Sequence, residues 1–207
     1  MARNKQGILF VVSAPSGAGK TTLVNKVIAA LPGVGLSVSC TTRPPRPGEQ
    51  TGVDYSFISR DEFTAMEQAG KFMEWARVHG DLYGTPRANV ERLKDGEDLI
   101  LEIDTQGARE IRKVFPESVL IFILPPSLEV LRGRLQARGG DSEEAMAARL
   151  HNAQKELDQI ARYDYIVVNA EIEEATRELA SIITAERCKT ARVLEREKGG
   201  TYGANNG

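Results

Sequence analysis

The sequence predicts an α/β fold in which a parallel sheet is covered by helices on both faces. Short runs rich in valine, isoleucine and leucine recur along the chain, as expected of buried strands. Segments with helical periodicity separate these runs, and such alternation is typical of a parallel sheet. The first run leads directly into a glycine-rich loop, a lysine and two threonines, which is the order of a phosphate-binding loop.

This first stretch has the sequence GILFVVSAPSGAGKTT and covers residues 7–22. Ile8 to Val12 is a predicted strand, and the segment 23–31 is a predicted helix. Gly17 and Gly19 let the backbone bend so that several N–H groups converge on one anion, at the positive end of the helix. Lys20 would reach the β and γ phosphates of a nucleotide, and the Thr21 hydroxyl would ligate Mg²⁺.

The stretch departs from the P-loop pattern G-x-x-x-x-G-K-[ST] at one position, because Ala14 stands where the first glycine belongs. The alternative is a glycine turn that leaves Lys20 exposed and without a ligand. The preceding strand and the following helix favour the phosphate-binding loop, so nucleotide binding is the hypothesis.

The composition is that of a soluble globular protein with one domain. The chain has 207 residues, of which 41% are hydrophobic and 27% charged. A net charge of −2 argues against nucleic acid as a partner. Cys40 and Cys188 lie far apart and form no metal-binding spacing. We expect a cytoplasmic protein that does not bind a membrane, since neither a signal peptide nor a membrane span is evident.

The segment TTRPPRPGEQTGVDY follows a break at Pro32 and a predicted strand over 36–40. Its prolines exclude a regular helix or a central strand. Arg43 and Arg46 lie three residues apart on this stiffened backbone and could clamp a phosphate. A solvated surface loop is the alternative, and the residues alone leave both open.

Two predicted strands, 55–58 and 72–78, flank a helix that begins with a capping box at residues 59–62 and ends near Gly70. Trp75 in the second strand is predicted to lie in the core. Glu74 could accept the two N–H donors of a guanine edge, but an exposed alternating face is the favoured interpretation.

A turn-rich stretch over 80–86 and a polar helix to about residue 94 precede a predicted strand over 99–103. Glu102 and Asp104 stand at the carboxyl end of this strand, where open α/β sheets bind ligands. Asp104 could organise Mg²⁺ directly or through water, and it could also cap the helix predicted over 105–114.

The region after the strand predicted over 118–124 is rich in arginine. Two helices, from Ser127 to about Ala137 and from 141–144 to about Arg162, flank the Gly139-Gly140 turn. Their arginines, Arg134, Arg138 and Arg149, could form a lid over a triphosphate, or they could belong to solvated helix faces.

A last strand over 165–169 and a helix over 172–197 complete the predicted core. The helix has an apolar stripe at Ala175, Leu179, Ile182 and Ile183. The tail that follows is low in hydrophobic residues and is predicted to be disordered.

Seven motifs in this order resemble the guanylate kinase family: SAPSGAGKTT, SCTTRPPRPGE, DYSFIS, EWARVHGDLYGT, LEIDTQG, RLQARGG and IVVN. The resemblance covers about residues 7–187, and bacterial members often carry alanine at the position of Ala14. It implies a P-loop kinase fold with a core made of 7–36, 95–126 and 158–190. It further implies an inserted GMP-binding lobe over 37–94 and a helical lid over 127–157. The extension 191–207, expected to be partly disordered, has no family role.

The implied activity is Mg²⁺-dependent transfer of the γ-phosphoryl group of ATP to GMP, and to dGMP, in purine nucleotide metabolism. The ATP-binding residues would be Ala14, Pro15, Ser16, Gly17, Ala18, Gly19, Lys20, Thr21, Thr22 and Asn169. The GMP-binding residues would be Ser39, Arg43, Arg46, Tyr55, Glu74, Tyr83, Thr85, Glu102 and Asp104. Catalysis would depend on Lys20, Arg43, Arg134, Arg138 and Arg149, and the metal would be held by Thr21 and Asp104, the latter directly or through water.

Two other functions compete with this one. Guanylate-kinase-like domains also serve as peptide-binding scaffolds, but those typically lose the P-loop lysine and the lid arginines, which are present here. A related kinase with another acceptor, such as AMP or a ribose phosphate, is the second alternative. Both a monomer and a homo-oligomer are compatible with the sequence.

Overall fold

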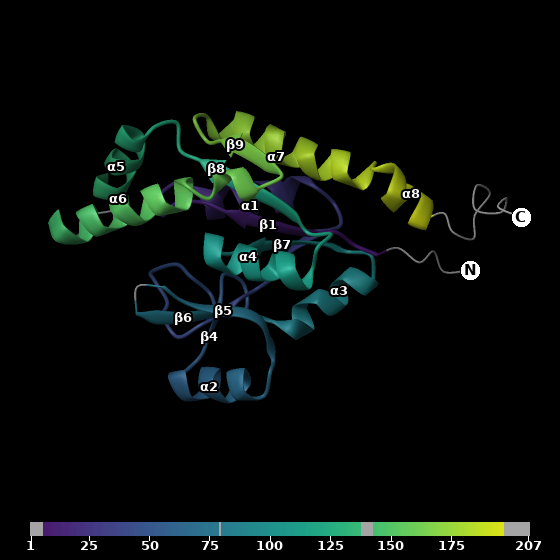
Figure 1. Ribbon diagram of the computed structural model, residues 1–207, viewed down its shortest axis with the longest axis horizontal. Helices are drawn as coiled ribbons and strands as arrows, with labels where there is room; N and C mark the ends of the chain where they lie inside the picture. The colour runs from purple at the N-terminus through teal and green to yellow at the C-terminus, as the bar shows by residue number, and fades with distance from the viewer. Residues whose placement is uncertain (1–5, 79, 138–142, 197–207) are drawn as a thin grey trace, which may run out of the picture.

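The computed structural model describes residues 6–78, 80–137 and 143–196, and its central feature is a five-stranded sheet (Figure 1). The strand order is β2-β7-β1-β8-β9, and every adjacent pair is parallel. Leu9 pairs with Leu99, and Phe10 pairs with Val119 on the other side. The strands are β1 (Leu9–Ser13), β2 (Val34–Leu36), β7 (Asp98–Glu102), β8 (Val119–Leu124) and β9 (Tyr165–Val168).

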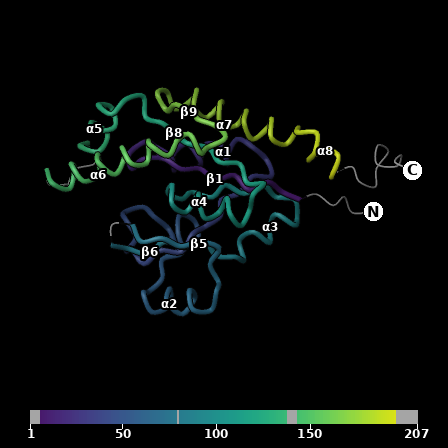
Figure 2. Tube along the Cα trace, viewed as in Figure 1, coloured from purple at the N-terminus to yellow at the C-terminus, as the bar shows by residue number. Residues whose placement is uncertain are grey.

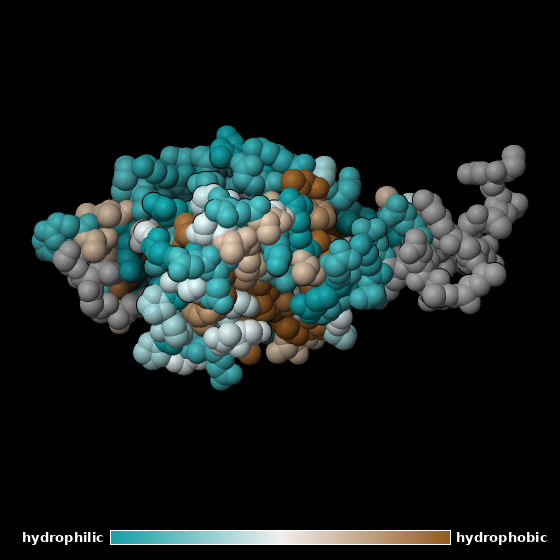
Figure 3. Space-filling view, turned by 90° about the horizontal axis from the view of Figure 1, so that it is seen from below, coloured by the Kyte–Doolittle hydropathy of each residue, from teal (hydrophilic) through white to brown (hydrophobic). Residues whose placement is uncertain are grey.

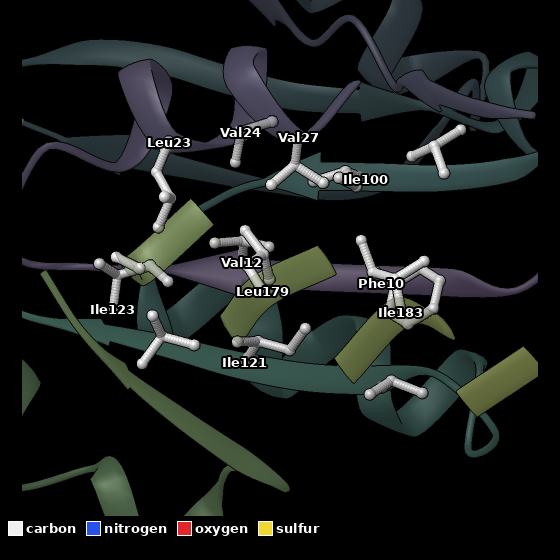
Figure 4. Packing of buried hydrophobic residues seen from close by; sticks show 14 of the residues in the cluster. Phe10, Val12, Leu23, Val24, Val27, Ile100, Ile121, Ile123, Leu179 and Ile183 are labelled. Carbon is white, nitrogen blue, oxygen red and sulfur yellow. The ribbon is translucent and has the colours of Figure 1, made fainter. Parts of the chain in front are cut away.

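Helices cover both faces of this sheet, which confirms the predicted fold class. Phe10 and Val12 of β1 point to one face, where they pack with α1 (Lys20–Ala30) and α7 (Ile172–Arg187) (Figure 4). Leu9 and Val11 point to the other face, where α3 (Glu91–Lys94) and α4 (Thr105–Val114) lie. Because side chains alternate along a strand and both faces are buried, β1 is apolar at every position before Ser13.

A second, four-stranded sheet is inserted between β2 and β7 and lies below the core in Figures 1 and 2. Its order is β4-β3-β6-β5, with α2 (Arg60–Gln68) packed on it through Phe63. Ser59 caps α2 with Glu62 in the predicted capping box. The strands are β3 (Cys40–Thr41), β4 (Ser56–Phe57), β5 (Phe72–Val78) and β6 (Asp81–Pro86).

The strand predicted over 36–40 is wrong in its bounds, because the chain leaves the first sheet after Leu36 and enters the second at Cys40. The turn-rich segment predicted over 80–86 is also wrong. It forms strand β6, which pairs antiparallel with β5, with Val78 opposite Asp81. Gly84 of β6 suits this position because a Cβ there would lie 2.9 Å from the ring of Phe72.

The prediction that Trp75 lies in the core is wrong, since 42% of Trp75 is exposed. The register of β5 against β6 shifts between Phe72 and Glu74. This bulge breaks the alternation, so that Met73 and Glu74 are both buried. Trp75 then lies on the face of the sheet that packs against α2, where its ring meets that of Phe63 edge-on at 6.3 Å.

The arginine-rich region forms a helix pair that projects from the core (Figures 1 and 2). Helices α5 (Leu128–Ala137) and α6 (Glu143–Leu157) pack through Leu131, Leu135 and Ala153. The predicted Gly139-Gly140 turn and residues 141–142 lie outside the described residues. Two short 3₁₀ helices, η1 (Arg87–Val90) and η2 (Ile160–Arg162), precede α3 and β9.

The single helix predicted over 172–197 is wrong, because it is broken into α7 and α8 (Thr190–Arg196). The fully buried carboxylate of Glu186 lies at the break. It accepts hydrogen bonds from the Tyr165 hydroxyl at 2.6 Å and from Arg192 at 3.4 Å, and pairs with Lys189 at 2.7 Å. These contacts tie α8 back to the end of α7 and to β9. The disorder predicted for the tail concerns residues outside the described part of the chain.

The surface is predominantly hydrophilic on the face shown in Figure 3, where hydrophobic atoms form patches among polar ones. Within the described residues, no helix is both long and apolar enough to cross a membrane.

Asp98 at the start of β7 offers a test of how the sheet is held together. Its buried carboxylate accepts from the backbone N–H of Ile8 at 2.7 Å and from Arg187 of α7 at 2.6 Å. We expect Asp98→Ala to lower the free energy of unfolding by about 2 to 4 kcal/mol, because the Ile8 N–H and Arg187 Nε lose their buried charged acceptor. Urea unfolding measures this. Removing the exposed Lys26–Glu173 pair by Glu173→Ala is the control, and an equal loss there would contradict the role of Asp98.

Candidate functional site

A cleft of about 270 Å³ opens at the carboxyl ends of β1 and β7. The chain passes from β1 to β2 on one side of the sheet and later to β8 on the other, so the cleft lies where the strand order reverses. Its walls come from the loop after β1, the end of β7, the second sheet and α6. The lining residues include Ala14, Pro15, Ser16, Gly17, Gly19, Lys20, Thr21, Thr22, Ser39, Arg46, Tyr55, Glu74, Tyr83, Glu102, Asp104 and Glu156.

The loop from Ala14 to Gly19 links β1 to α1. Gly17 and Gly19 have φ angles of 92° and 89°, which residues with a side chain rarely adopt. A Cβ at Gly19 would also lie 2.5 Å from the side-chain nitrogen of Asn169. Ala14 packs against the hydrophobic core, so the methyl group that breaks the sequence pattern points into a place that accepts it.

Lys20 and Thr21, at the start of α1, reach across to the end of β7. Lys20 Nζ donates to the carbonyl of Ile103 at 3.2 Å, and the Thr21 hydroxyl donates to Glu102 at 2.9 Å. The positive end of α1, an ammonium group and a hydroxyl therefore converge beside Glu102 and Asp104. This arrangement can bind a polyphosphate together with a divalent cation.

Asp104 caps a helix as expected, and its expected role at Mg²⁺ stays a prediction. Its carboxylate accepts from the backbone N–H of Gly107 at 2.8 Å and so caps α4, and it also lines the cleft. The described residues contain no group of three histidine, cysteine or acidic side chains that could bind a metal by themselves.

Asn169 and Arg134 hydrogen-bond to the glycine-rich loop. Asn169 Nδ2 donates to the carbonyl of Ala18 at 2.7 Å. Arg134 on α5 donates to the same carbonyl at 3.3 Å and to the carbonyl of Asn169 at 3.0 Å. The loop is thus held between β9 and the arginine-rich helix pair.

The three predicted lid arginines are placed differently. Arg134 lies against the glycine-rich loop, and Arg149 is on α6; neither lines the cleft. Arg138 lies outside the described residues.

Glu74 and Thr85 form a buried polar pair on β5 and β6. The Thr85 hydroxyl donates to one oxygen of Glu74. The other oxygen faces α4, where a Cβ on Gly107 would lie 2.9 Å from it. Only 8% of Glu74 is exposed, so the favoured interpretation of an exposed face is wrong. Burial, with the nearby charge of Asp104 as a smaller contribution, raises the pKa of Glu74 to about 7.

A second cleft of about 130 Å³ adjoins the first and contains Arg43 and Arg46. The two clefts share Thr21, Ser39, Arg46, Tyr55, Tyr83 and Glu102 as lining residues. The rings of Tyr55 and Tyr83 meet edge-on at 5.9 Å. Burial raises the pKa of Tyr55 to about 12, so its hydroxyl remains a hydrogen-bond donor at neutral pH.

We next compared the sequence and the structure with those of known proteins. The sequence model described as guanylate kinase matches residues 6–186. A guanylate kinase of Geobacter sulfurreducens is 52% identical over 192 residues, which are 92% of this chain and 95% of the relative. One of Symbiobacterium thermophilum is 48% identical over 93% of this chain and 92% of the relative.

This chain belongs to the guanylate kinase family.

The crystal structure of guanylate kinase from Anaplasma phagocytophilum agrees, with a TM-score of 0.80 and 34% identity over 98% of this chain and 99% of that one. The predicted family and fold are therefore confirmed. So is the predicted enzyme class, because members of the guanylate kinase family are nucleoside monophosphate kinases.

Two residues of the site were not predicted from the sequence. Glu49 pairs with Arg43 in the second cleft. Glu156 on α6 lines the main cleft; burial raises the pKa of its carboxyl to about 7, although the charge of Lys20 opposes the shift. Glu49 stands in the proline-rich motif and could have been found by asking which anion balances two arginines. Glu156 gave no signal, since its helix is charged at many positions.

The two raised pKa values predict how stability varies with pH. Both carboxyls have pKa values near 7 in the folded chain and an ordinary value of 4.5. The folded state thus binds protons more tightly, and stability falls as pH rises through 7. We expect unliganded protein to unfold at lower urea concentration at pH 8 than at pH 5, and Glu74→Gln with Glu156→Gln to reduce this difference. Glu178→Gln, an exposed change on α7, should retain it; an unaltered pH dependence in the double variant would refute the assignment.

Proposed function

We propose that the chain transfers the γ-phosphoryl group of ATP to GMP, giving ADP and GDP, and that it also accepts dGMP. The observation that carries this proposal is that a phosphate-binding loop and an arginine-containing cleft share one wall. Two phosphate groups bound in these clefts would meet near Thr21 and Glu102. A coupled assay of ADP release with GMP, AMP, UMP and CMP tests the proposal, and GMP should be the preferred acceptor.

The donor would bind at the glycine-rich loop. Backbone N–H groups from Ala14 to Thr22 would surround the β and γ phosphates, and Lys20 would exchange the carbonyl of Ile103 for phosphate oxygens. Asn169 fixes the loop through the carbonyl of Ala18 and would lie close to the adenine.

The acceptor would bind in the lobe formed by residues 37–94. Ser39, Arg43, Arg46, Tyr55 and Tyr83 would hold the phosphate of GMP. Glu74 and Thr85 would recognise the base, with Glu74 accepting from guanine N1–H and N2–H and Asp104 nearby. Because adenine does not present these two donors, the carboxylate discriminates between the purines.

The residues at the end of β7 suit Mg²⁺. Thr21 offers a hydroxyl and Asp104 a carboxylate, either directly or through water, and these are the hard oxygen ligands that Mg²⁺ prefers. Phosphate oxygens and water would complete its shell. When bound, the ion would neutralise charge on the transferring phosphate.

No covalent intermediate is needed, because the acceptor phosphate oxygen is itself the nucleophile. The protein positions the two nucleotides and stabilises the charge of a loose transition state. Lys20 and Arg43 would act from the two clefts, and the lid over 127–157 would bring Arg134, Arg138 and Arg149 toward the donor. The lid motion would also exclude water, which otherwise competes as acceptor.

We place this activity in the cytoplasm, in purine nucleotide metabolism, with small nucleotides as the partners and neither nucleic acid nor membrane. A monomer and a homo-oligomer are both compatible with it.

Lys20→Ala tests the donor side. Turnover should fall below about one per cent of the parent value, since the lysine charge has no substitute in the loop. Steady-state kinetics measure this, and the urea unfolding midpoint should stay close to that of the parent. Turnover well above that level would contradict the role of Lys20.

Glu74→Gln tests the base. The ratio of kcat/KM for GMP to that for AMP should fall by about tenfold or more, because the amide cannot accept both guanine donors with full charge. Glu178→Gln, an exposed change on α7 outside both clefts, is the control. If discrimination between GMP and AMP were unchanged, Glu74 would not be the residue that recognises the base.

A further inference from the structure

The second cleft contains an anion that belongs to the protein. The carboxylate of Glu49 accepts from both Nη1 and Nη2 of Arg43, each at 2.9 Å. It also accepts from the backbone N–H of Arg46 at 2.7 Å. Only 11% of the Arg43 side chain and 19% of the Glu49 side chain are exposed. One carboxylate therefore fixes both arginines, Arg43 through its side chain and Arg46 through its main chain.

The hydrogen bonds of Arg43 use one side of its guanidinium. The group has five N–H donors, and two of its edges can each pair with an oxoanion. Glu49 occupies the Nη1–Nη2 edge, and the carbonyl of Pro44 takes a further hydrogen of Nη1 at 2.7 Å. Nε is buried and has no hydrogen-bond partner within the described residues. The Nε–Nη2 edge is thus the one that Glu49 does not occupy.

Aromatic rings restrict the guanidinium further. Arg43 Cζ lies 5.6 Å from the ring centroids of both Tyr55 and Phe57. Tyr83, which lines both clefts, is also close to the guanidinium. The hydrogen bonds from Arg43 lower the pKa of Glu49, so the carboxylate keeps its charge at neutral pH.

We propose that Glu49 is a positioning residue of the acceptor site, which holds the Nη1–Nη2 edge of Arg43 and so presents the Nε–Nη2 edge to the phosphate of the acceptor nucleotide. This inference rests on the proposed function, because it takes the GMP phosphate as the occupant. The alternative is that Glu49 merely occupies the phosphate position and is displaced by substrate. The two differ in sign, because a displaced competitor weakens GMP binding whereas a positioning residue strengthens it.

The experiment compares Glu49→Gln, Arg43→Lys and the double variant. Glutamine lacks the charge that pairs with both Nη atoms, and lysine keeps the charge of Arg43 without its second edge. We expect Glu49→Gln to raise KM for GMP by about 10- to 100-fold, the range expected for lost charge-assisted hydrogen bonds. KM for ATP should be unchanged, and so should competitive inhibition by guanosine, which lacks the phosphate. Glu67→Gln, a change on α2 outside both clefts, is the control.

The double variant shows whether Glu49 acts through Arg43. If it does, Glu49→Gln should add little to the loss caused by Arg43→Lys, and the two effects should be far from additive. Unchanged or tighter binding of GMP in Glu49→Gln would overturn the inference, as would additive losses or an equal weakening toward guanosine. If the parent enzyme failed to phosphorylate GMP, the proposed function itself would fail, so the two failures are distinguishable.

Discussion

Two polyanions must be held against their mutual repulsion, and this constraint explains where the positive groups of the site lie. Lys20 and the start of α1 face one cleft, and the guanidinium groups of Arg43 and Arg46 face the other. The parallel sheet makes this possible, because the carboxyl ends of β1 and β7 are adjacent and their loops open toward the same side. The two clefts thus arise from the strand order.

The cations of the site are already paired in the unliganded protein. Lys20 donates to a backbone carbonyl, Arg43 to Glu49, and Arg134 to the carbonyls of Ala18 and Asn169. Pairing reduces the cost of keeping such groups partly out of water and fixes their orientation before substrate arrives. Under the proposed function, Lys20 would exchange its partner when substrate binds, whereas Arg43 would gain a phosphate while keeping Glu49. The two basic side chains would therefore act differently. The ammonium of Lys20 would give up its carbonyl, whereas the guanidinium of Arg43 has a second edge that Glu49 does not occupy.

The sequence predicted those features that depend on local chemistry. The P-loop, the capping box at Ser59 and Glu62, and helix 105–114 follow from short motifs, and the structure has them. Strand β1 is predictable from its apolar run because both of its faces are covered. The failures came from pairing between distant segments. The bulge in β5 buries Glu74 and exposes Trp75, and β6 exists because it pairs with β5. The sequence predicts one continuous helix through Cys188. The helix breaks there, and the buried carboxylate of Glu186 pairs with Lys189 and Arg192 after the break.

Glu74, whose burial the sequence does not predict, lies where the lobe formed by residues 37–94 contacts the core. Met73 belongs to the core cluster that includes Ala108 and Ile111 of α4, and the carboxylate of Glu74 faces Gly107 of the same helix. The bulge thus lets one strand of the lobe contact the core with two consecutive residues, one apolar and one acidic. Asp104, which caps α4, borders the same cleft as Glu74. A base bound by Glu74 would therefore lie where lobe and core touch, and its binding would favour one relative position of the two. Recognition of the base and alignment of the acceptor phosphate would then depend on the same contact between lobe and core.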